Sequence, residues 1–381
     1  MLKPDYSNSI VNLVSSLARG LGAKENDYEP LAGMGAMASG DQPLVLFILD
    51  GLGDSFLQGF PASFLFRHRK GRLTSVFPPT TAAAVTSFFT GVAPQQHAIT
   101  GWHTYFKELG AVATVLPFMP RYRGACFSEA GISPAQLIGH DSLLNTLPLP
   151  CHAILPHHLI DSDYSRTLCG RASRHGFESL SDMFDLVDRL AVPHQAGLII
   201  AYWPELDSLA HVHGVGSVEV ADHFRELDRG CQETLTLLKA RGAKVVVSAD
   251  HGLIDTCPEH IIYLEDHPEL AATLTLPLCG EPRCAYCYVR SDRSQEFERY
   301  IAARLGHACT LRKSSELIAE GYFGKGRPDP RLGERVGEYV LLMKENYIIR
   351  DLLLNEKKSQ QNGVHGGLSG QELYVPLIML E

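Results

Sequence analysis

Residues 44–49 read LVLFIL and run directly into Asp50. Three similar apolar runs follow along the chain: GLIIA at 197–201, VVV at 245–247 and VPLIML at 375–380. Continuous Val, Ile and Leu runs of this length are typical of strands that are buried on both faces. Helical patterns at 82–89 and 218–238 lie between these runs. The alternation predicts an α/β fold, with a central, largely parallel β-sheet sandwiched by helices.

The remaining segments suggest how the chain is organised. Ile10, Leu13, Val14, Leu17 and Leu21 recur at helical spacing, so residues 1–40 are expected to form an N-terminal segment with a surface or docking helix. Residues 41–381 form the expected catalytic domain. Two stretches of it, at about 111–180 and 290–360, have the loop-rich or charged character of inserted cap segments.

Composition excludes several classes of protein. The chain is 45% hydrophobic and 20% charged, with a net charge of −9, which argues against a surface for nucleic-acid polymers. No stretch approaches the roughly 18 apolar residues of a membrane span, and polar residues interrupt the N-terminal apolar pattern, so we find no signal peptide. We therefore expect a cytoplasmic protein.

The chain has nine cysteines, an odd number without the spacing of a disulfide framework, and they are expected to be reduced thiols. Cys284 and Cys287 form a CxxC motif that could bind zinc. The surrounding RCAYCYVR alternates like a β-strand and has no second CxxC, which favours a structural role.

Acidic and histidine side chains follow the ends of the predicted strands. In open α/β sheets this is the edge at which ligands bind. Spacing of four residues within PELDSLAHVHG would place an aspartate and a histidine on one face of a helix. The set makes two groups of three, which suits two catalytic metal ions about 3.5–4 Å apart that stabilise attacking and leaving oxygens. The candidate ligands are Asp50, Asp207, His211, Asp250, His251 and His365.

A nucleophile is expected at the start of the helix after VFPPTT. Thr80 can be the N-cap, which leaves Thr81 in the first turn, where the helix dipole and free N–H groups favour an alkoxide and an incoming phosphate. Metal coordination could activate this hydroxyl.

Taken in order, these motifs resemble the alkaline phosphatase superfamily and are most similar to its type I phosphodiesterase/nucleotide pyrophosphatase family. The resemblance implies one metal held by Asp207, His211 and His365 and a second held by the other three ligands. It also implies that Thr81 is the nucleophile, because the family's threonine lies ten residues before the glycine of a TG pair, here Gly91. A phospho-threonine intermediate would follow.

The sequence departs from better-known family members beside the nucleophile. Ala82 and Ala84 occupy the positions of an aromatic that stacks on a nucleobase and an asparagine that helps to hold a phosphate oxygen. Tyr202 matches the second stacking aromatic. Trp102 and Tyr105 are further candidates for substrate binding.

The expected function is hydrolysis of phosphodiester or pyrophosphate bonds in a small phosphate ester, with a nucleotide as one candidate. The two divalent ions are expected to be Zn²⁺, with Mn²⁺ or Fe as alternatives. A phosphomonoesterase or phosphonate hydrolase on the same metal pair is the alternative, for which Arg283 and Lys107 are candidates to bind the extra charge. A non-catalytic phosphate-ligand binder is the third reading.

Overall fold

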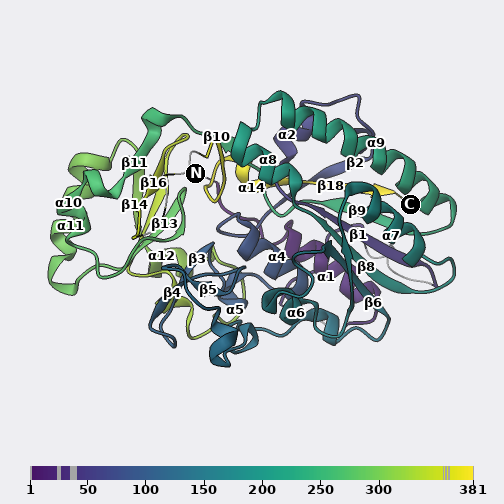
Figure 1. The fold of residues 1–381 in the computed structure, drawn as a ribbon, viewed down its shortest axis with the longest axis horizontal. Coiled ribbons are helices and arrows are strands. Elements are labelled where there is room, and N and C mark those ends of the chain that lie inside the picture. The colour runs from purple at the N-terminus through teal and green to yellow at the C-terminus, as the bar shows by residue number, and fades with distance from the viewer. Residues whose placement is uncertain are drawn as a thin grey trace.

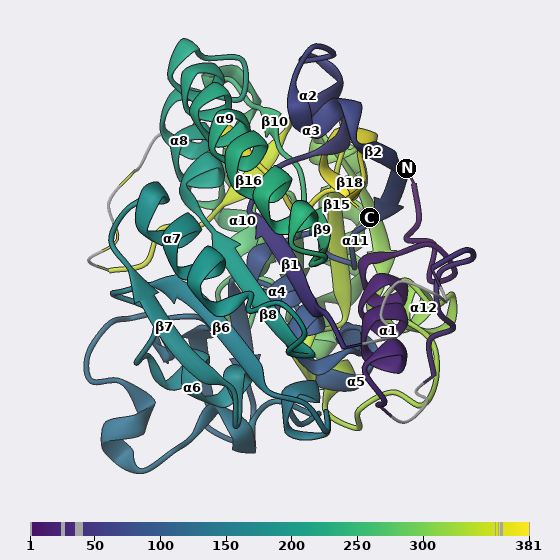
Figure 2. The ribbon, with the colours of Figure 1, turned by 90° about the vertical axis from the view of Figure 1, so that its right-hand side faces the viewer.

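The computed structural model describes residues 2–23, 27–34, 41–354, 356, 358 and 361–380. The predicted apolar runs form the centre of a seven-stranded sheet (Figures 1 and 2). Its order is β2 (Arg69–Thr74), β18 (Tyr374–Leu380), β9 (Lys244–Ser248), β1 (Pro43–Leu49), β8 (Gly197–Trp203), β6 (Cys151–Pro156) and β7 (Ser173–Phe177).

The sheet is largely parallel, as predicted. Strands β9, β1, β8, β6 and β7 run parallel, whereas β18 is antiparallel to both β9 and β2. All seven residues of β1 and of β8 are buried, which explains why these strands read as continuous apolar runs.

Helices cover both faces of this sheet (Figure 1). One face is covered by α7 (Leu180–Leu190) and α9 (Val218–Ala240), and the other by α1 (Ile10–Gly20), α4 (Thr81–Thr90) and α6 (Asp163–Cys169). The α/β fold with a helix-sandwiched sheet is therefore confirmed.

The N-terminal helix α1 is not the surface helix that we expected. Residues 10–18 are all buried, and the helix packs against α4. The polar residues that interrupt its apolar pattern are satisfied internally, since Asn12 Nδ2 donates to the carbonyls of Tyr6 at 3.1 Å and Glu29 at 2.8 Å, and Ser16 Oγ donates to Asn12 O at 2.8 Å. Residues 24–26 and 35–40 of the predicted N-terminal segment lie outside the described residues.

A second seven-stranded sheet forms a cap beside the first (Figure 1). Its order is β14 (Cys309–Lys313), β15 (Tyr339–Met343), β13 (Cys284–Cys287), β12 (Cys279–Glu281), β3 (His103–Phe106), β4 (Ala111–Thr114) and β5 (Met119–Pro120). Helices α10 (Pro268–Ala271), α11 (Ser294–Tyr300), α12 (Ser314–Ala319) and α13 (Leu332–Arg335) lie in the same part of the chain.

The cap boundaries differ from the predicted insertions. Residues 151–177, within the predicted first insertion, add β6, α6 and β7 to the main sheet, whereas the cap begins at β3 and resumes at β12. Short, half-buried β7 lacks the continuous apolar run that marks the central strands. All nine cysteines are free, and neither of the two potential metal-binding groups among the described residues contains one.

Short elements complete the fold. Two further strand pairs form small sheets of their own: β10 (Ile254–Asp255) with β17 (Gly363–Val364), and β11 (Ile261–Tyr263) with β16 (Ile348–Arg350). The short helices are α2 (Asp54–Gln58), α3 (Phe64–Arg67), α5 (Pro94–His97), α8 (Glu205–His213) and α14 (Gly370–Leu373). No helix among the described residues is both long and apolar enough to cross a membrane.

Candidate active site

The site lies at the carboxyl ends of the three central strands. Asp50 directly follows β1, the pair Asp250–His251 follows β9, and helix α8, with Asp207 and His211, follows β8. Because β1 is hydrogen-bonded in parallel to β9 on one side and β8 on the other, these ends meet at one edge of the sheet. Topology thus brings together candidate ligands that are far apart in the sequence.

Gly51 allows the close approach of this edge to helix α8. It has a φ of 76°, and a Cβ added there would lie 2.7 Å from Leu253 Cδ1 and 3.0 Å from Asp207 Cα. Only glycine fits such a position without strain. The glycine of the FILDGLGD motif therefore lets Asp50 and Asp207 share one site.

Two groups of potential ligand atoms result. Within each group, the atoms all lie within 4.8 Å of one another. The first group, Asp50, Asp250 and His251, is the same as one of the two sets implied by the family resemblance.

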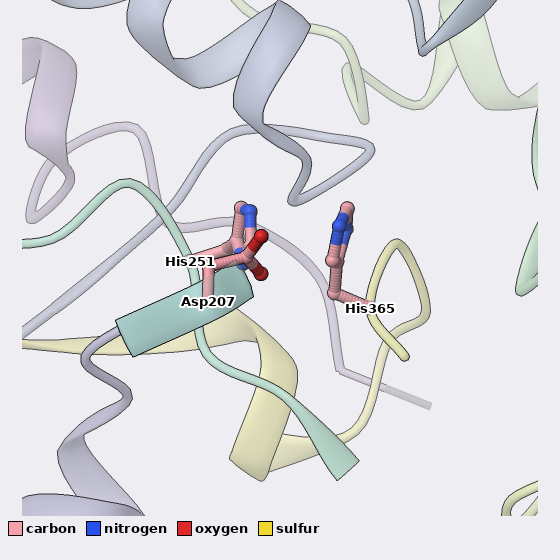
Figure 3. Close-up of side chains that lie close together, drawn as sticks. All are labelled: Asp207, His251 and His365. Carbon is pink, nitrogen blue, oxygen red and sulfur yellow. The ribbon is translucent and has the colours of Figure 1, made fainter. Parts of the chain in front are cut away.

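The second group differs in one member from the implied set. It comprises Asp207, His251 and His365 (Figure 3). His251 therefore belongs to both groups. His211, the implied third ligand, lies beside this group, with its Nε2 3.2 Å from Asp207 Oδ2 and its ring centroid 5.1 Å from that of His365.

Backbone carbonyls orient two of the histidines. His211 Nδ1 is 2.7 Å from Gly363 O, and His251 Nδ1 is 3.1 Å from Gly252 O. A proton on each Nδ1 leaves Nε2 with a free lone pair, and the two Nε2 atoms face the carboxylates. A hydrogen bond of this kind is what usually orients a metal-ligating histidine.

Four buried atoms of the ligand set have no hydrogen-bond partner: Asp50 Oδ1, Asp207 Oδ1, Asp250 Oδ2 and His365 Nδ1. They are half of the eight such side-chain atoms found among the described residues. Buried polar atoms are seldom left unpaired, since each costs free energy. Carboxylate oxygens and imidazole nitrogens are ligands of divalent transition metals, so this donor set fits such cations.

The charges of the site also fit bound divalent cations. Burial and then the neighbouring Asp250 and Asp207 raise the pKa of Asp50 well above its ordinary value, and burial also raises the pKa of Asp250. Burial disfavours the charged form of Asp207 too, but His211 holds the pKa of Asp207 below its ordinary value, and Asp207 in turn raises the pKa of His211 to about 9. Bound cations would relieve the repulsion between the carboxylates.

Removal of metal with a chelator is expected to lower the midpoint of thermal unfolding, by more at mildly alkaline than at mildly acidic pH. In the metal-free protein the raised pKa values of Asp50 and Asp250 mean that folding binds protons, so stability falls as pH rises above the ordinary carboxyl pKa. Metal ligands must be deprotonated, so the loaded protein binds its ions more tightly over the same range. Calorimetry on loaded and chelated protein checks this. Equal unfolding midpoints for loaded and chelated protein at every pH would contradict the proposed metal pair.

The two threonines at the start of α4 have different surroundings. Thr81 is 9% exposed, lines the cavity of the site, and places Oγ1 3.1 Å from His251 Nε2. Thr80 is the N-cap but makes no side-chain capping bond; its fully buried hydroxyl donates instead to Glu281 Oε1 at 2.5 Å. Only the second hydroxyl of the pair faces the potential metal ligands.

The three candidate substrate-binding aromatics lie in different places. Tyr202 is buried, donates its hydroxyl to Asp50 Oδ2 and is not among the residues that line the cavity. Tyr105 packs edge-on against Tyr288, with ring centroids 5.3 Å apart. Trp102 lines the cavity and is 38% exposed.

A cavity of about 630 Å³ lies between the cap and the carboxyl ends of the strands. Thr81, Asp207, His211 and His365 line its inner end, and the cap contributes Trp102, Glu281 and three arginines, Arg121, Arg123 and Arg350. Arg121 is committed to ion pairs with Asp351 at 2.7 Å and Glu356 at 2.9 Å. The volume suits a small-molecule ligand.

Neither predicted phosphate-binding cation lies in this cavity. Arg283 is buried in a bidentate ion pair with Glu372, at 3.0 and 2.9 Å, and Lys107 is exposed and paired with Glu334. Glu281, which approaches the site from the cap, is not among the residues predicted from the sequence. Its one signal is a carboxyl in the short hairpin CGEPRCAYC, where Arg283 is the other charged residue.

The chain is similar to known proteins in sequence and in fold. The family model for type I phosphodiesterase / nucleotide pyrophosphatase matches residues 44–368. No curated protein sequence matches the chain. Among solved structures, murine ectonucleotide pyrophosphatase / phosphodiesterase 5 is similar with a TM-score of 0.65 and 16% identity, over 88% of this chain and 87% of the other. Phosphonoacetate hydrolase from Sinorhizobium meliloti 1021, solved with phosphonoformate, has a TM-score of 0.59 and 18% identity, over 89% and 90%.

Proposed function

Because the chain belongs to the type I phosphodiesterase / nucleotide pyrophosphatase family, within the alkaline phosphatase superfamily, we propose that it hydrolyses phosphodiester or pyrophosphate bonds in small phosphate esters. Nucleotide esters are among the candidate substrates. We further propose Thr81 as the nucleophile and two divalent cations, Zn²⁺ in the first instance, as cofactors.

One observation carries the proposal. The Thr81 hydroxyl lies in the first turn of α4 and in the cavity, 3.1 Å from a histidine that belongs to both groups of potential ligands. Asp50, Asp250 and His251 would hold one cation. Asp207, His365 and the adjacent His211 would hold the other. When bound, such ions polarise the phosphoryl oxygens and favour ionised hydroxyl groups.

The proposed reaction has two steps, attack by Thr81 and hydrolysis of the phospho-threonine. The Thr81 oxygen attacks phosphorus and forms a P–O bond while the bond to the leaving-group oxygen breaks, and the hydroxyl proton passes to solvent. Water then attacks the phospho-threonine, which restores Thr81 and releases the phosphate product. The first N–H groups of α4, which the Thr80 side chain does not cap, are available to phosphoryl oxygens, and the helix dipole favours their charge.

A relative supports the role of the threonine. A threonine-to-alanine variant of the murine protein is inactive and has been solved in complex with AMP; its fold matches this chain with a TM-score of 0.65. We assign the same role to Thr81 in the present chain, because its hydroxyl lies in the cavity beside His251.

The test compares a chromogenic bis-aryl phosphate, the matching mono-aryl phosphate and phosphonoacetate, with metal content measured on the same sample. We expect kcat/KM for the diester to exceed that for the monoester by at least about tenfold, because neither Arg283 nor Lys107, the two cations predicted to bind a second phosphate charge, lies in the cavity. Preference for the monoester or for the phosphonate would contradict the proposal and indicate a phosphomonoesterase or a phosphonate hydrolase instead. Full metal occupancy without turnover of any of the three would indicate a binding protein.

A further inference from the structure

Glu281 is a buried carboxyl that reaches the site from the cap. It ends strand β12 and is 7% exposed. Its Oε1 accepts two hydrogen bonds, from Thr80 Oγ1 at 2.5 Å and from the backbone N–H of Trp102 at 2.7 Å. Among the described residues Oε2 has no hydrogen-bond donor, and Glu281 lines the cavity. Because Glu281 lines the cavity, its carboxyl is part of the wall that a bound ligand would meet.

The carboxyl is close to both parts of the proposed catalytic machinery. On one side it holds Thr80, the residue before Thr81. On the other it contacts the loop that carries His365, since a Cβ added to Gly366 would lie 2.7 Å from Glu281 Cβ. Burial raises the pKa of Glu281 to about 7, an effect that the Thr80 and Trp102 hydrogen bonds partly oppose.

The charge of Glu281 affects which phosphoryl groups the site can bind. The carboxylates of Asp50, Asp207, Asp250 and Glu281 together carry as much negative charge as two divalent cations carry positive charge. A diester phosphoryl group brings a single negative charge, whereas the phosphoryl group of a monoester is a dianion at mildly alkaline pH. A negative side chain beside the nucleophile disfavours the second charge more than the first.

We propose that Glu281 is a specificity-determining residue that selects phosphoryl groups with a single negative charge by repelling dianionic ones. The inference rests on the proposed function, because it assumes that a phosphoryl group binds beside Thr81. Such repulsion would favour the phosphodiesters and pyrophosphates of the proposed function over phosphate monoesters.

The first test uses Glu281→Gln at mildly alkaline pH. The glutamine side-chain oxygen can still accept from Thr80 and Trp102, so the change removes charge and keeps the hydrogen bonds. We expect the ratio of monoester to diester kcat/KM to rise on the order of tenfold. Glu334→Gln is the matched control, because it removes the same charge from an exposed pair with Lys107 outside the cavity, and it should leave the ratio unchanged.

Thr80→Val separates charge from hydrogen bonding. It removes the bond to Glu281 but keeps the carboxylate, so we expect turnover of both esters to fall while their ratio stays within about twofold of the wild type. Glu281→Asp, which keeps the charge on a shorter side chain, should also keep the wild-type preference. A change of ratio in Thr80→Val equal to that in Glu281→Gln would overturn the charge argument.

The second test measures binding without turnover, in metal-loaded Thr81→Ala protein. Calorimetry with inorganic phosphate, a dianion at mildly alkaline pH, should show on the order of tenfold tighter binding after Glu281→Gln, whereas the Kd of a monoanionic phosphonate monoester should change little. Equal effects on both ligands would overturn the inference. If the wild type hydrolyses the diester but Glu281→Gln does not change the ratio of monoester to diester kcat/KM, the role of Glu281 alone is contradicted. If the wild type has no phosphoesterase activity, the proposed function itself is contradicted.

Discussion

Replacing Thr81 by alanine is expected to lower kcat for a phosphodiester by about four orders of magnitude or more, which is the scale seen when an enzyme loses its nucleophile. The physical reason is that the Thr81 hydroxyl is the one oxygen of the Thr80–Thr81 pair that lies in the cavity and within 3.1 Å of His251 Nε2. The methyl group of alanine cannot form the phospho-threonine. Burst and steady-state kinetics on the metal-loaded variant measure the loss.

Two controls make the result specific. Thr81→Ser keeps a hydroxyl on the same Cβ and should retain turnover within about tenfold of the wild type. Metal content and the unfolding midpoint of Thr81→Ala should match the wild type, because the threonine is not among the proposed ligands. Substantial retained activity would transfer the role to Thr80 or to direct attack by water.

Breaking the buried ion pair between Arg283 and Glu372 is expected to destabilise the protein by about 3–5 kcal/mol. The two side chains are 1% and 0% exposed and are joined by two hydrogen bonds, at 3.0 and 2.9 Å. Glu372 also accepts from Gly367 N and Ser369 Oγ, both at 2.6 Å, so it connects the cap hairpin to the loop that carries His365. Glu372→Gln and Arg283→Met each leave a buried partner without its counter-charge.

Denaturant unfolding of each single variant and of the double variant measures this effect. In the double variant no uncompensated charge remains, so its free energy of unfolding should fall by less than the sum of the two single changes. Metal affinity should fall in the Glu372→Gln variant, since the His365 loop loses its anchor. Single variants that unfold like the wild type would show that the pair contributes little to joining the cap to the loop.

The sequence predicted the sheet and the place of the acidic side chains at its edge for the same reason. Strands buried on both faces must be continuously apolar, so residues 44–49, 197–201 and 245–247 were recognisable without any partner. Polar residues that follow such a run have to lie at the sheet edge. Asp50, Asp207 and Asp250 were therefore predictable as neighbours once the strands were assigned as parallel.

The sequence could not predict which way a side chain points at that edge. Tyr202 was expected to face substrate, and its hydroxyl donates to Asp50, which directly follows the adjacent strand β1. Helix α1 was expected at the surface, yet its polar residues find carbonyl partners in Tyr6 and Glu29. The local pattern is the same whether a polar group is bound by water or by a buried carbonyl.

The sequence by itself determined the α/β class, the strands of the central sheet, the six acidic and histidine residues at its edge and the helix that begins at Thr81, because each depends on local periodicity or on the residues next along the chain. The tertiary structure alone decided the cap boundaries, the position of His251 between the two ligand groups and the contact of Glu281 with Thr80. That last pair is 201 residues apart in the chain. Contacts at such separations depend on how whole elements pack, and the local sequence pattern does not predict them.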